Sequence, residues 1–164
     1  MSNPPRAVRM DDLTQWLCPR EIELDLEVPN RWEALRAVSA IVARSQPVDA
    51  PAVFRALWRR EQAGSTGVGN AFAIPHARIT GITEPATVYV RMKSALDFAA
   101  PDGKRVSDLY VILVPADGAN AVHLQLLALV AEAFSDRNFR TRLAAASDPQ
   151  DVRSAFSRWI QARQ

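Results

Sequence analysis

The chain has 164 residues, of which 48% are hydrophobic and 23% charged, and these values are typical of one globular domain that needs no disulfides. Its 20 Lys and Arg against 18 Asp and Glu give a formal net charge of only +2 without blocks of like charge, which argues against nucleic-acid binding. The single cysteine, Cys18, excludes an intramolecular disulfide and suits a reducing cytoplasm, and no apolar run of about 18 residues predicts a membrane span.

The first half of the chain predicts helices and strands in alternation. Residues 1–10 lack the apolar stretch of a signal peptide, so we expect a flexible lead-in followed by one domain over 11–164. Asp11 and Asp12 can cap a short helix that runs through Leu17. The elements predicted after it are a strand over 22–28, an amphipathic helix over 31–45 capped by Asn30, a helix from Asp49 to a stop at Gly64, and a short apolar strand over 71–75.

The second half predicts two longer strands and then three helices. The pattern over 86–93 alternates, whereas 107–115 is almost continuously apolar and is therefore expected to be a buried central strand. Helices are predicted over 121–135, over 137–146 and, opened by the Asp148-Pro149 pair, to about Gln161. Interleaved strands and helices favour a single α/β domain with a mixed β-sheet and helices on both faces.

The most unusual stretch is "GSTGVGNAFAIPHARI", residues 64–79. It fits neither nucleotide-binding glycine motif, since no Lys follows the last glycine and a helix precedes the stretch where a strand would be needed. Glycine's permissive backbone favours an ordinary interpretation, in which Gly64 ends a helix and Gly67 and Gly69 form a tight turn. A second interpretation stays open: backbone N–H groups of such a turn can bind a small anion.

His76 is the sharper candidate. It follows Pro75 at the end of the predicted short strand, and loops at strand ends commonly carry functional sites. A neutral imidazole can attack a phosphoryl or acyl centre, or act as a base, because its pKa lies near neutrality. Without an identified neighbour, a merely packed or solvent-facing histidine is equally compatible with the pattern.

Two further residues have two interpretations each. His123 lies in the first turn of the predicted helix 121–135, where its spacing is typical of a half-buried core histidine but where the helix N-terminus would also favour a bound anion. Arg60 closes the helix before the glycine turn, either as a solvated side chain or as a guanidinium that turns inward onto phosphate oxygens. The apolar residues predicted to form the buried face of the helix with His123 are Leu124, Leu127, Val130 and Phe134.

Hydrolase and metal chemistry have less support. The G-x-S-x-G motif of a serine hydrolase is absent, although Ser65 or Thr66 could formally pair with His76. His76 and His123 show no H-x-H or H-E-x-x-H spacing, so we predict no metal site and no cofactor.

The segment "RREQAGSTGVGNAFAIPHARI" resembles the signature of the fructose/mannitol-type IIA domains of the bacterial phosphoenolpyruvate-dependent sugar phosphotransferase system. A second block, "LDFAAPDGKRVSDLYVILVPADGANAVHLQLLALVAEAF", continues the resemblance, which covers roughly residues 11 to 160 and is greatest for the nitrogen-regulatory branch. The family's fold is a mixed β-sheet with helices on both faces, in agreement with the pattern of elements above.

The resemblance implies a role for each candidate residue. His76 would accept a phosphoryl group from a phosphohistidine carrier of the HPr type, with Arg60 and His123 in the family's two supporting positions. Ser65 and Thr66 match its loop hydroxyls. The backbone N–H groups of Gly67–Gly69 would supply further donors, with no metal or cofactor needed. Ala77 departs from the pattern, which usually has glycine there, and a methyl group would disturb the loop if that position required a positive φ.

Three functions remain open at this stage. The first is a regulatory phosphocarrier in nitrogen metabolism, because a phosphate on a surface histidine adds charge and can switch an interface with a target protein. The second is a sugar-specific IIA subunit that passes phosphate to a separate IIB protein. The third is a binding module that keeps the fold without being phosphorylated. The chain ends soon after the IIA-like region, and Cys18 has no phosphate loop after it, so we favour the regulator over the sugar-specific subunit. In either case we expect a phosphoryl carrier and not a free-standing enzyme.

Overall fold

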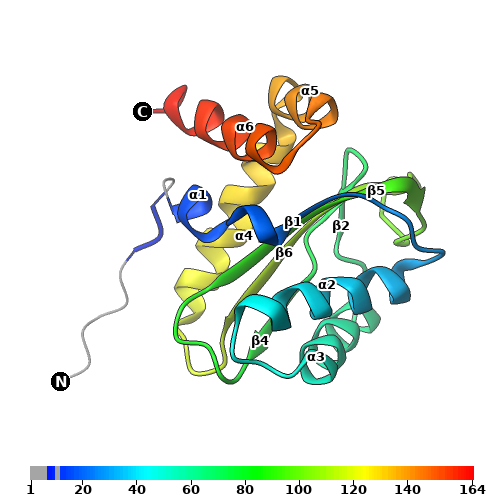
Figure 1. Ribbon diagram of the computed structural model, residues 1–164, viewed down its shortest axis with the longest axis vertical. Coiled ribbons are helices and arrows are strands. Elements are labelled where there is room, and N and C mark those ends of the chain that lie inside the picture. The colour runs from blue at the N-terminus through cyan, green and yellow to red at the C-terminus, as the bar shows by residue number, and fades with distance from the viewer. Residues whose placement is uncertain (1–6, 10–11) are drawn as a thin grey trace.

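The computed structural model describes residues 7–9 and 12–164, so the predicted cap Asp11 and most of the lead-in 1–10 lie outside the described residues. Figure 1 shows the arrangement of the elements. In chain order they are α1 (Asp12–Trp16), η1 (Pro19–Glu21), β1 (Ile22–Leu26), α2 (Arg31–Ser45), α3 (Ala50–Gln62), β2 (Gly67–Gly69), β3 (Phe72–Ala73), β4 (His76–Ile79), β5 (Ala86–Leu96), β6 (Val106–Pro115), α4 (Asn120–Ser135), α5 (Arg137–Ala145) and α6 (Pro149–Gln161).

The sheet is mixed, and β6 lies at its centre. The strand order is β1-β5-β6-β3-β2, with β4 also paired to β6. β5 and β6 run antiparallel, whereas β1 is parallel to β5, and both β3 and β4 are parallel to β6. The residues from Leu109 to Leu113 are fully buried. The prediction of a continuously apolar central strand over 107–115 is therefore confirmed.

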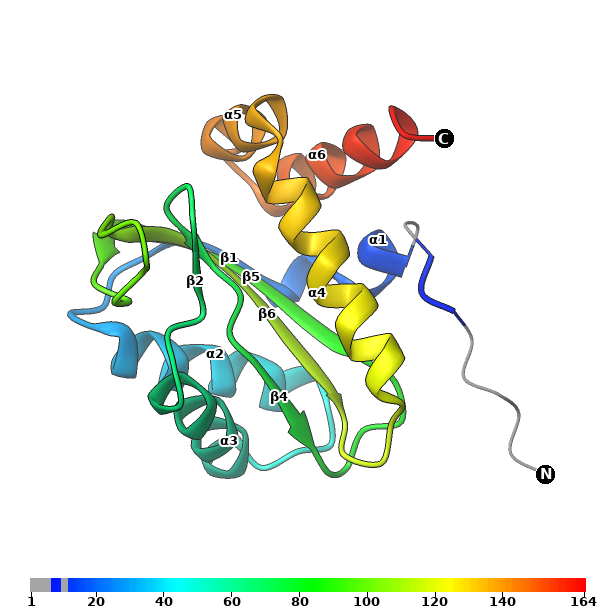
Figure 2. The same ribbon diagram turned by 180° about the vertical axis from the view of Figure 1, so that it is seen from behind.

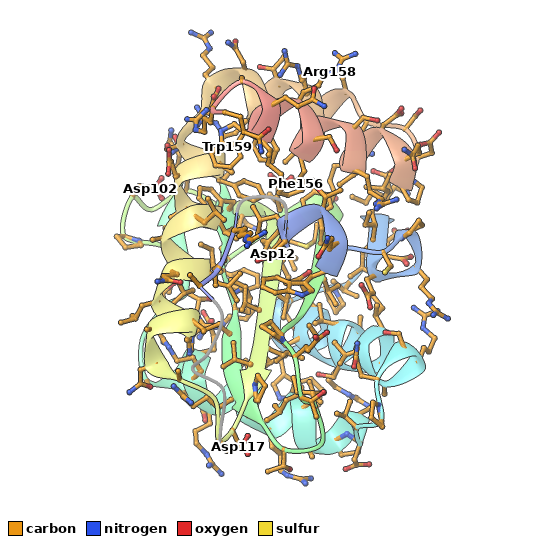
Figure 3. The ribbon with its side chains drawn as sticks, turned by 90° about the vertical axis from the view of Figure 1, so that its left-hand side faces the viewer. Asp12, Asp102, Asp117, Phe156, Arg158 and Trp159 are labelled. Carbon is orange, nitrogen blue, oxygen red and sulfur yellow. The ribbon has the colours of Figure 1, made fainter. Side chains whose placement is uncertain are left out.

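Helices cover both faces of the sheet. α2 and α3 lie together on one side, and α1, α4, α5 and α6 lie on the other (Figures 1 and 2). Each side has its own buried apolar cluster against the sheet. Phe156 and Trp159 of α6 belong to the cluster on the side of α1, α4 and α5, and both are almost completely buried (Figure 3). The predicted single α/β domain with helices on both faces is confirmed.

The region around His76 differs from the predicted strand over 71–75. Two short strands are found there, β3 and β4, both paired with β6 and separated by Ile74 and Pro75. Pro75 has no N–H to donate, so the ladder is interrupted at this point, although its carbonyl still accepts from the Ile112 N–H at 3.0 Å. His76 therefore begins β4, whereas the prediction placed it in a loop after the end of a strand over 71–75.

The predicted inner face of α4 is partly wrong. Val130 and Phe134 are buried as expected and Leu127 packs partly against the core, but Leu124 is 65% exposed. α4 is apolar at most positions, so its periodicity alone does not define which stripe faces inward. Packing against β6 selects a stripe that passes through Leu126.

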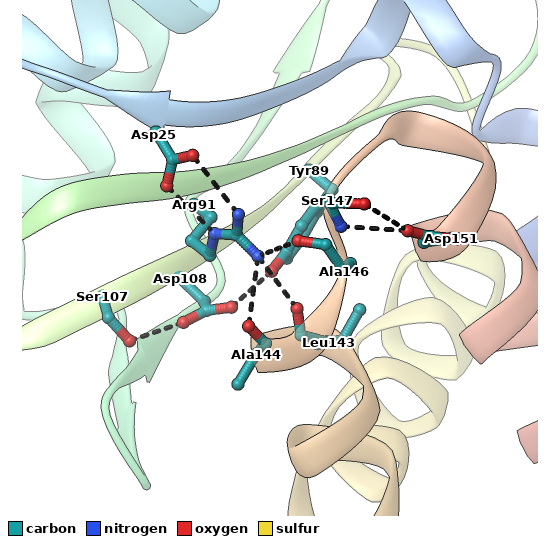
Figure 4. Close-up of polar contacts among 10 residues, drawn as sticks. All are labelled: Asp25, Tyr89, Arg91, Ser107, Asp108, Leu143, Ala144, Ala146, Ser147 and Asp151. Carbon is teal, nitrogen blue, oxygen red and sulfur yellow. Dashed lines mark hydrogen bonds and ion pairs between the residues drawn. The ribbon is translucent and has the colours of Figure 1, made fainter.

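Arg91 of β5 holds the C-terminal helices on the sheet (Figure 4). Its Nη1 donates to the carbonyl oxygens of Leu143, at 3.1 Å, and Ala146, at 2.7 Å, where α5 ends. The last carbonyl groups of a helix have no partner within the helix, so a cation at this end satisfies them and opposes the helix dipole. Arg91 also pairs with Asp25 of β1 at 3.4 Å, which joins an outer strand to the helical layer.

Candidate functional site

His76 is held in one tautomer at the start of β4. Its Nδ1 lies 2.8 Å from the carbonyl oxygen of Ile74. A carbonyl oxygen can only accept, so Nδ1 carries the proton and Nε2 keeps its lone pair. Burial lowers the pKa of His76 below its usual value; the Ile74 carbonyl works in the opposite direction, and the charge of Arg60 lowers the pKa further. The ring is therefore neutral at pH 7, with Nε2 available as a nucleophile.

Arg60, near the end of α3, turns inward onto this histidine. Its Nε–H donates to Nε2 of His76 at 3.2 Å, and its Nη1 donates to the carbonyl oxygen of Gly64 at 2.8 Å. The guanidinium therefore turns inward, and its predicted contact with phosphate oxygens stays a prediction. The guanidinium is fixed at two points and lies beside the atom that would react.

His123, in the first turn of α4, faces His76 from another element. The two ring centroids are 5.0 Å apart and the ring planes are nearly perpendicular, at 80°. Nε2 of His123 is buried and forms no hydrogen bond within the described part of the chain. Burial, followed by the nearby His76, Arg78 and Arg60, lowers the pKa of His123 to about 4. The site thus combines two neutral imidazoles with an arginine, and one buried ring nitrogen is unsatisfied.

The hydroxyl groups of Ser65 and Thr66, just before β2, donate hydrogen bonds to protein acceptors. Ser65 Oγ donates to the carbonyl oxygen of Phe98 and accepts from the Gly67 N–H at 3.0 Å. Thr66 Oγ1 donates to the buried carboxylate of Glu61, which also accepts from the Thr66 N–H at 3.3 Å. These contacts fix the shape of the loop. The predicted binding of phosphate by Ser65 and Thr66 stays a prediction.

The local backbone explains why residues 67 and 69 are glycines. A Cβ at Gly67 would lie 2.7 Å from the Cβ of Ala100, and Gly69 has a φ of +97°, which side-chain-bearing residues rarely adopt. The prediction that Gly67 and Gly69 form a tight turn is wrong: both lie in β2, and the chain reverses into β3 through Asn70 and Ala71, which have positive φ values. The proposed donation from the Gly67 and Gly69 amides to an anion stays a prediction.

Metal binding and membrane insertion are two further properties to compare with the structure. Within residues 7–9 and 12–164, no three His, Cys, Asp or Glu side chains gather as a metal ion would require. In the same residues, none of the helices combines the length and the apolar composition that crossing a bilayer would demand.

Comparison with known proteins gives the family. A model described as phosphoenolpyruvate-dependent sugar phosphotransferase system, EIIA 2, matches residues 16–159. The chain belongs to this family. The nitrogen regulatory protein of Pseudomonas aeruginosa is 36% identical to this IIA domain over 135 residues, or 82% of this chain and 87% of the relative. The fructose-specific EIIA component of Haloferax volcanii is 33% identical over 113 residues, or 69% of this chain and 73% of the relative.

A solved structure supports the same assignment. The nitrogen regulatory protein IIA-Ntr from Neisseria meningitidis matches this IIA domain with a TM-score of 0.83 and 33% identity, over 88% of this chain and 98% of that chain. The resemblance inferred from the two sequence blocks is therefore confirmed, including its similarity to the nitrogen-regulatory branch.

Ala77, where this IIA domain departs from the sequence pattern, has an ordinary strand conformation. It lies within β4, opposite Leu113 of β6, and it is not among the residues with a positive φ. Its methyl group is buried, at 7% exposure, in the apolar cluster beneath α2 and α3. The condition under which a methyl group would disturb this position is therefore not met.

Sequence reasoning missed two residues of the site. Glu61 is 3% exposed, and its carboxylate holds Thr66 in place. Its position four residues after the buried Leu57, on the inner stripe of α3, could have indicated a buried carboxylate in the sequence. Arg78 lies two residues after His76 on the same face of β4, and its signal was the period of two of a strand. It donates to the Gly118 carbonyl at 2.9 Å and to Asn120, at the start of α4.

Proposed function

We propose that this IIA domain is a regulatory phosphocarrier that accepts a phosphoryl group on Nε2 of His76 from an HPr-type phosphohistidine protein. One observation carries the proposal: Nδ1 of His76 is committed to the Ile74 carbonyl at 2.8 Å, which leaves the Nε2 lone pair directed at Arg60 and beside His123. Such an atom is a nucleophile at neutral pH, and cationic or hydrogen-bonding groups surround it.

The transfer balances without a metal or cofactor. The Nε2 lone pair of His76 forms a bond to phosphorus while the N–P bond of the donor breaks, and the bonding electrons return to the donor's imidazole. Catalysis of phosphoryl transfer depends mainly on positioning and on stabilising the charge of the equatorial oxygens. The fixed tautomer supplies the positioning, since no proton has to leave Nε2 before the attack.

Arg60 and His123 would stabilise that charge. Arg60 donates to Nε2 in the resting state, so its guanidinium has to shift from the nitrogen to the incoming phosphoryl oxygens. His123 would donate its unsatisfied Nε2–H, and the arriving negative charge would satisfy a buried donor. The backbone N–H groups of Gly67 and Gly69, with Ser65 and Thr66, would bind the remaining phosphoryl oxygens.

The regulatory role rests on charge and on the comparisons. A phosphoryl group adds about 1.5 to 2 negative charges at neutral pH, which is enough to change which proteins bind the surrounding surface. The similarity to nitrogen regulatory proteins at 36% and 33% identity favours binding to a regulatory target. A sugar-specific IIA subunit that passes phosphate to a separate IIB protein is the second candidate, and it is favoured by the similarity to a fructose-specific EIIA component at 33% identity.

The test is direct phosphorylation. The full chain is incubated with phosphoenolpyruvate, enzyme I and an HPr-type carrier, and acid-labile phosphate is mapped by mass spectrometry. We expect one phosphoryl group on His76, none in His76→Ala, and slower labelling with an unchanged position in His123→Ala. Phosphate that persists in His76→Ala would contradict the assignment, and a wild-type chain that stays unlabelled would support the non-phosphorylated binding module.

A second measurement separates the regulator from the sugar subunit. The phosphorylated protein is mixed with a fructose-type IIB protein and loss of the label is followed. We expect retention of the phosphoryl group over the time in which a sugar-specific IIA domain would transfer it completely. Rapid transfer to IIB would establish the second candidate.

A further inference from the structure

Arg78 carries a positive charge beside the site, and its hydrogen bonds go to uncharged groups of the turn that contains Asp117. Its Nη1 donates to the carbonyl oxygens of Gly118, at 2.9 Å, and Ala116, at 3.5 Å, and its Nη2 donates to the side-chain oxygen of Asn120. All three acceptors are uncharged. Within the described ranges, no ion pair involves Arg78.

These acceptors form the turn over residues 116–120 that leads into α4. Besides Arg78, two backbone bonds hold the turn: the Gly118 N–H donates to the Pro115 carbonyl at 2.9 Å, and the Ala116 N–H donates to the Ile79 carbonyl at 2.8 Å. The N-cap residue Ala119 has no side chain that can cap the helix, so Arg78 is the side chain that ties this end of α4 to the sheet. His123 lies only one turn further along α4, and its position therefore depends on the same contacts.

The turn also forms one wall of a cavity of about 470 Å³. Gly118 and Ala119 of the turn line that wall together with Pro115 at the end of β6 and Val122 of α4, and Trp16 and Pro85 lie among the other lining residues. A displacement of the turn would consequently change the shape of a surface hollow as well as the start of α4.

His76 and Arg78 lie on the same face of β4, and residues two apart on a strand are separated by about 7 Å. A phosphoryl group on Nε2 would extend from His76 and place a dianion near a long, flexible arginine side chain. A guanidinium and a phosphoryl dianion also attract each other by charge, and their planar and tetrahedral groups fit two parallel hydrogen bonds. The carbonyl and amide oxygens that now hold Arg78 would compete poorly with phosphoryl oxygens.

We propose that Arg78 is a positioning residue that couples the phosphorylation of His76 to the turn over residues 116–120. In the resting protein, its guanidinium holds Gly118 and Asn120 and so fixes the start of α4. When His76 carries a phosphoryl group, the guanidinium turns toward the phosphoryl oxygens and releases the turn. This inference rests on the proposed function, because it needs a phosphoryl group on His76.

The result is a surface that differs between the two phosphorylation states. The release concerns the wall of the cavity formed by Pro115, Gly118, Ala119 and Val122, and not only the atoms next to His76. A protein that binds this wall would distinguish the two states without touching the phosphoryl group.

The test is amide hydrogen exchange of Gly118, measured by NMR on the full chain. The protein is phosphorylated with phosphoramidate, a small donor that modifies histidine directly, and modification of His76 is verified by mass spectrometry. We expect the Gly118 amide to exchange about fivefold faster or more when His76 is phosphorylated. Exchange at an unchanged rate in fully phosphorylated protein would overturn the proposal.

Variants provide the controls. Arg78→Gln should show fast exchange at Gly118 in both states, whereas Arg142→Gln, which removes an exposed arginine on α5, should behave like wild type. Slow exchange at Gly118 in unphosphorylated Arg78→Gln would show that the arginine does not hold the turn. That outcome overturns the proposal even without phosphorylation.

A second readout separates positioning from general loosening. Arg78→Lys keeps the charge but not the fork that reaches several acceptors. Arg78→Lys should show fast exchange at Gly118 and keep the wild-type equilibrium of phosphoryl transfer with the HPr-type donor. Arg78→Gln should shift this equilibrium about tenfold toward the phosphorylated donor. Equal equilibria in all variants would remove Arg78 from contact with the phosphoryl group. Loading by phosphoramidate but not by the protein donor would contradict the proposed function alone.

Discussion

Replacing Ala77 by glycine should destabilise this IIA domain, although the family's sequence pattern has glycine at the equivalent place. Ala77 is 7% exposed, and it packs in the cluster beneath α2 and α3. Removing one buried carbon group costs about 0.8 kcal/mol. Glycine in a strand interior costs roughly 0.5–1 kcal/mol more through backbone entropy.

The expected loss in the free energy of unfolding is therefore about 1.5 kcal/mol. For a domain of this size, it corresponds to a decrease of about 3–6 °C in Tm. Urea denaturation followed by tryptophan fluorescence measures the free energy, and the rate of phosphorylation by the HPr-type donor is measured in parallel. We expect that rate to change by less than about twofold, because φ at Ala77 is not positive and the loop needs no glycine there.

A matched control is Ala95→Gly in β5, where the alanine is only half-buried. This variant keeps the backbone effect and loses less burial, so its destabilisation should be about 0.5–1 kcal/mol. Equal or greater stability of Ala77→Gly would refute the packing of the methyl group. An increase in phosphorylation rate of tenfold or more would show that Ala77 obstructs the loop after all.

Three further substitutions test the site and the scaffold. Arg60→Ala should slow phosphorylation of His76 by about 10²–10³-fold, because a charge-stabilising donor is lost, and it should raise the pKa of His76, which NMR titration measures; an unchanged rate would exclude Arg60 from the mechanism. Arg91→Ala should reduce the free energy of unfolding by about 2–4 kcal/mol, since carbonyl groups at the end of α5 lose a charged donor, and a loss below about 0.5 kcal/mol in urea denaturation would contradict this role. The pKa of His123 is about 4 in the folded protein and near 6.5 in the unfolded chain, so the unfolded chain binds the proton first as the pH is lowered. The free energy of unfolding of wild type should therefore decrease from pH 7 to pH 5, and His123→Asn should make this decrease smaller. Parallel pH profiles of wild type and variant would argue against this sign.

Most helices and the central strand could be predicted because their signals are local. Caps such as Asn30 and Asp49 do accept hydrogen bonds from the first turns of α2 and α3, and the apolar run over 107–115 does form the central strand. The failures have a common cause. Leu124 was assigned to the wrong face of α4, because a helix that is apolar on most sides is oriented only by what it packs against.

The strand near His76 shows a similar limit. Its apolar residues predict a strand, but the interruption at Pro75 and the continuation as β4 depend on pairing with β6. Arg78 was missed for the same reason, because its acceptors Gly118 and Asn120 lie far along the chain.

The amino-acid sequence by itself determined the class of fold, the family through its two blocks, and the three candidate residues His76, Arg60 and His123. Only the tertiary structure decided what these residues do to one another. The tautomer of His76 is set by the carbonyl of Ile74, two residues before it. The inward turn of Arg60 and the approach of His123 to His76 follow from contacts between α3, β4 and α4. Such contacts have no local signal, because hydrogen bonds and burial between distant segments exist only once the sheet has brought those segments together.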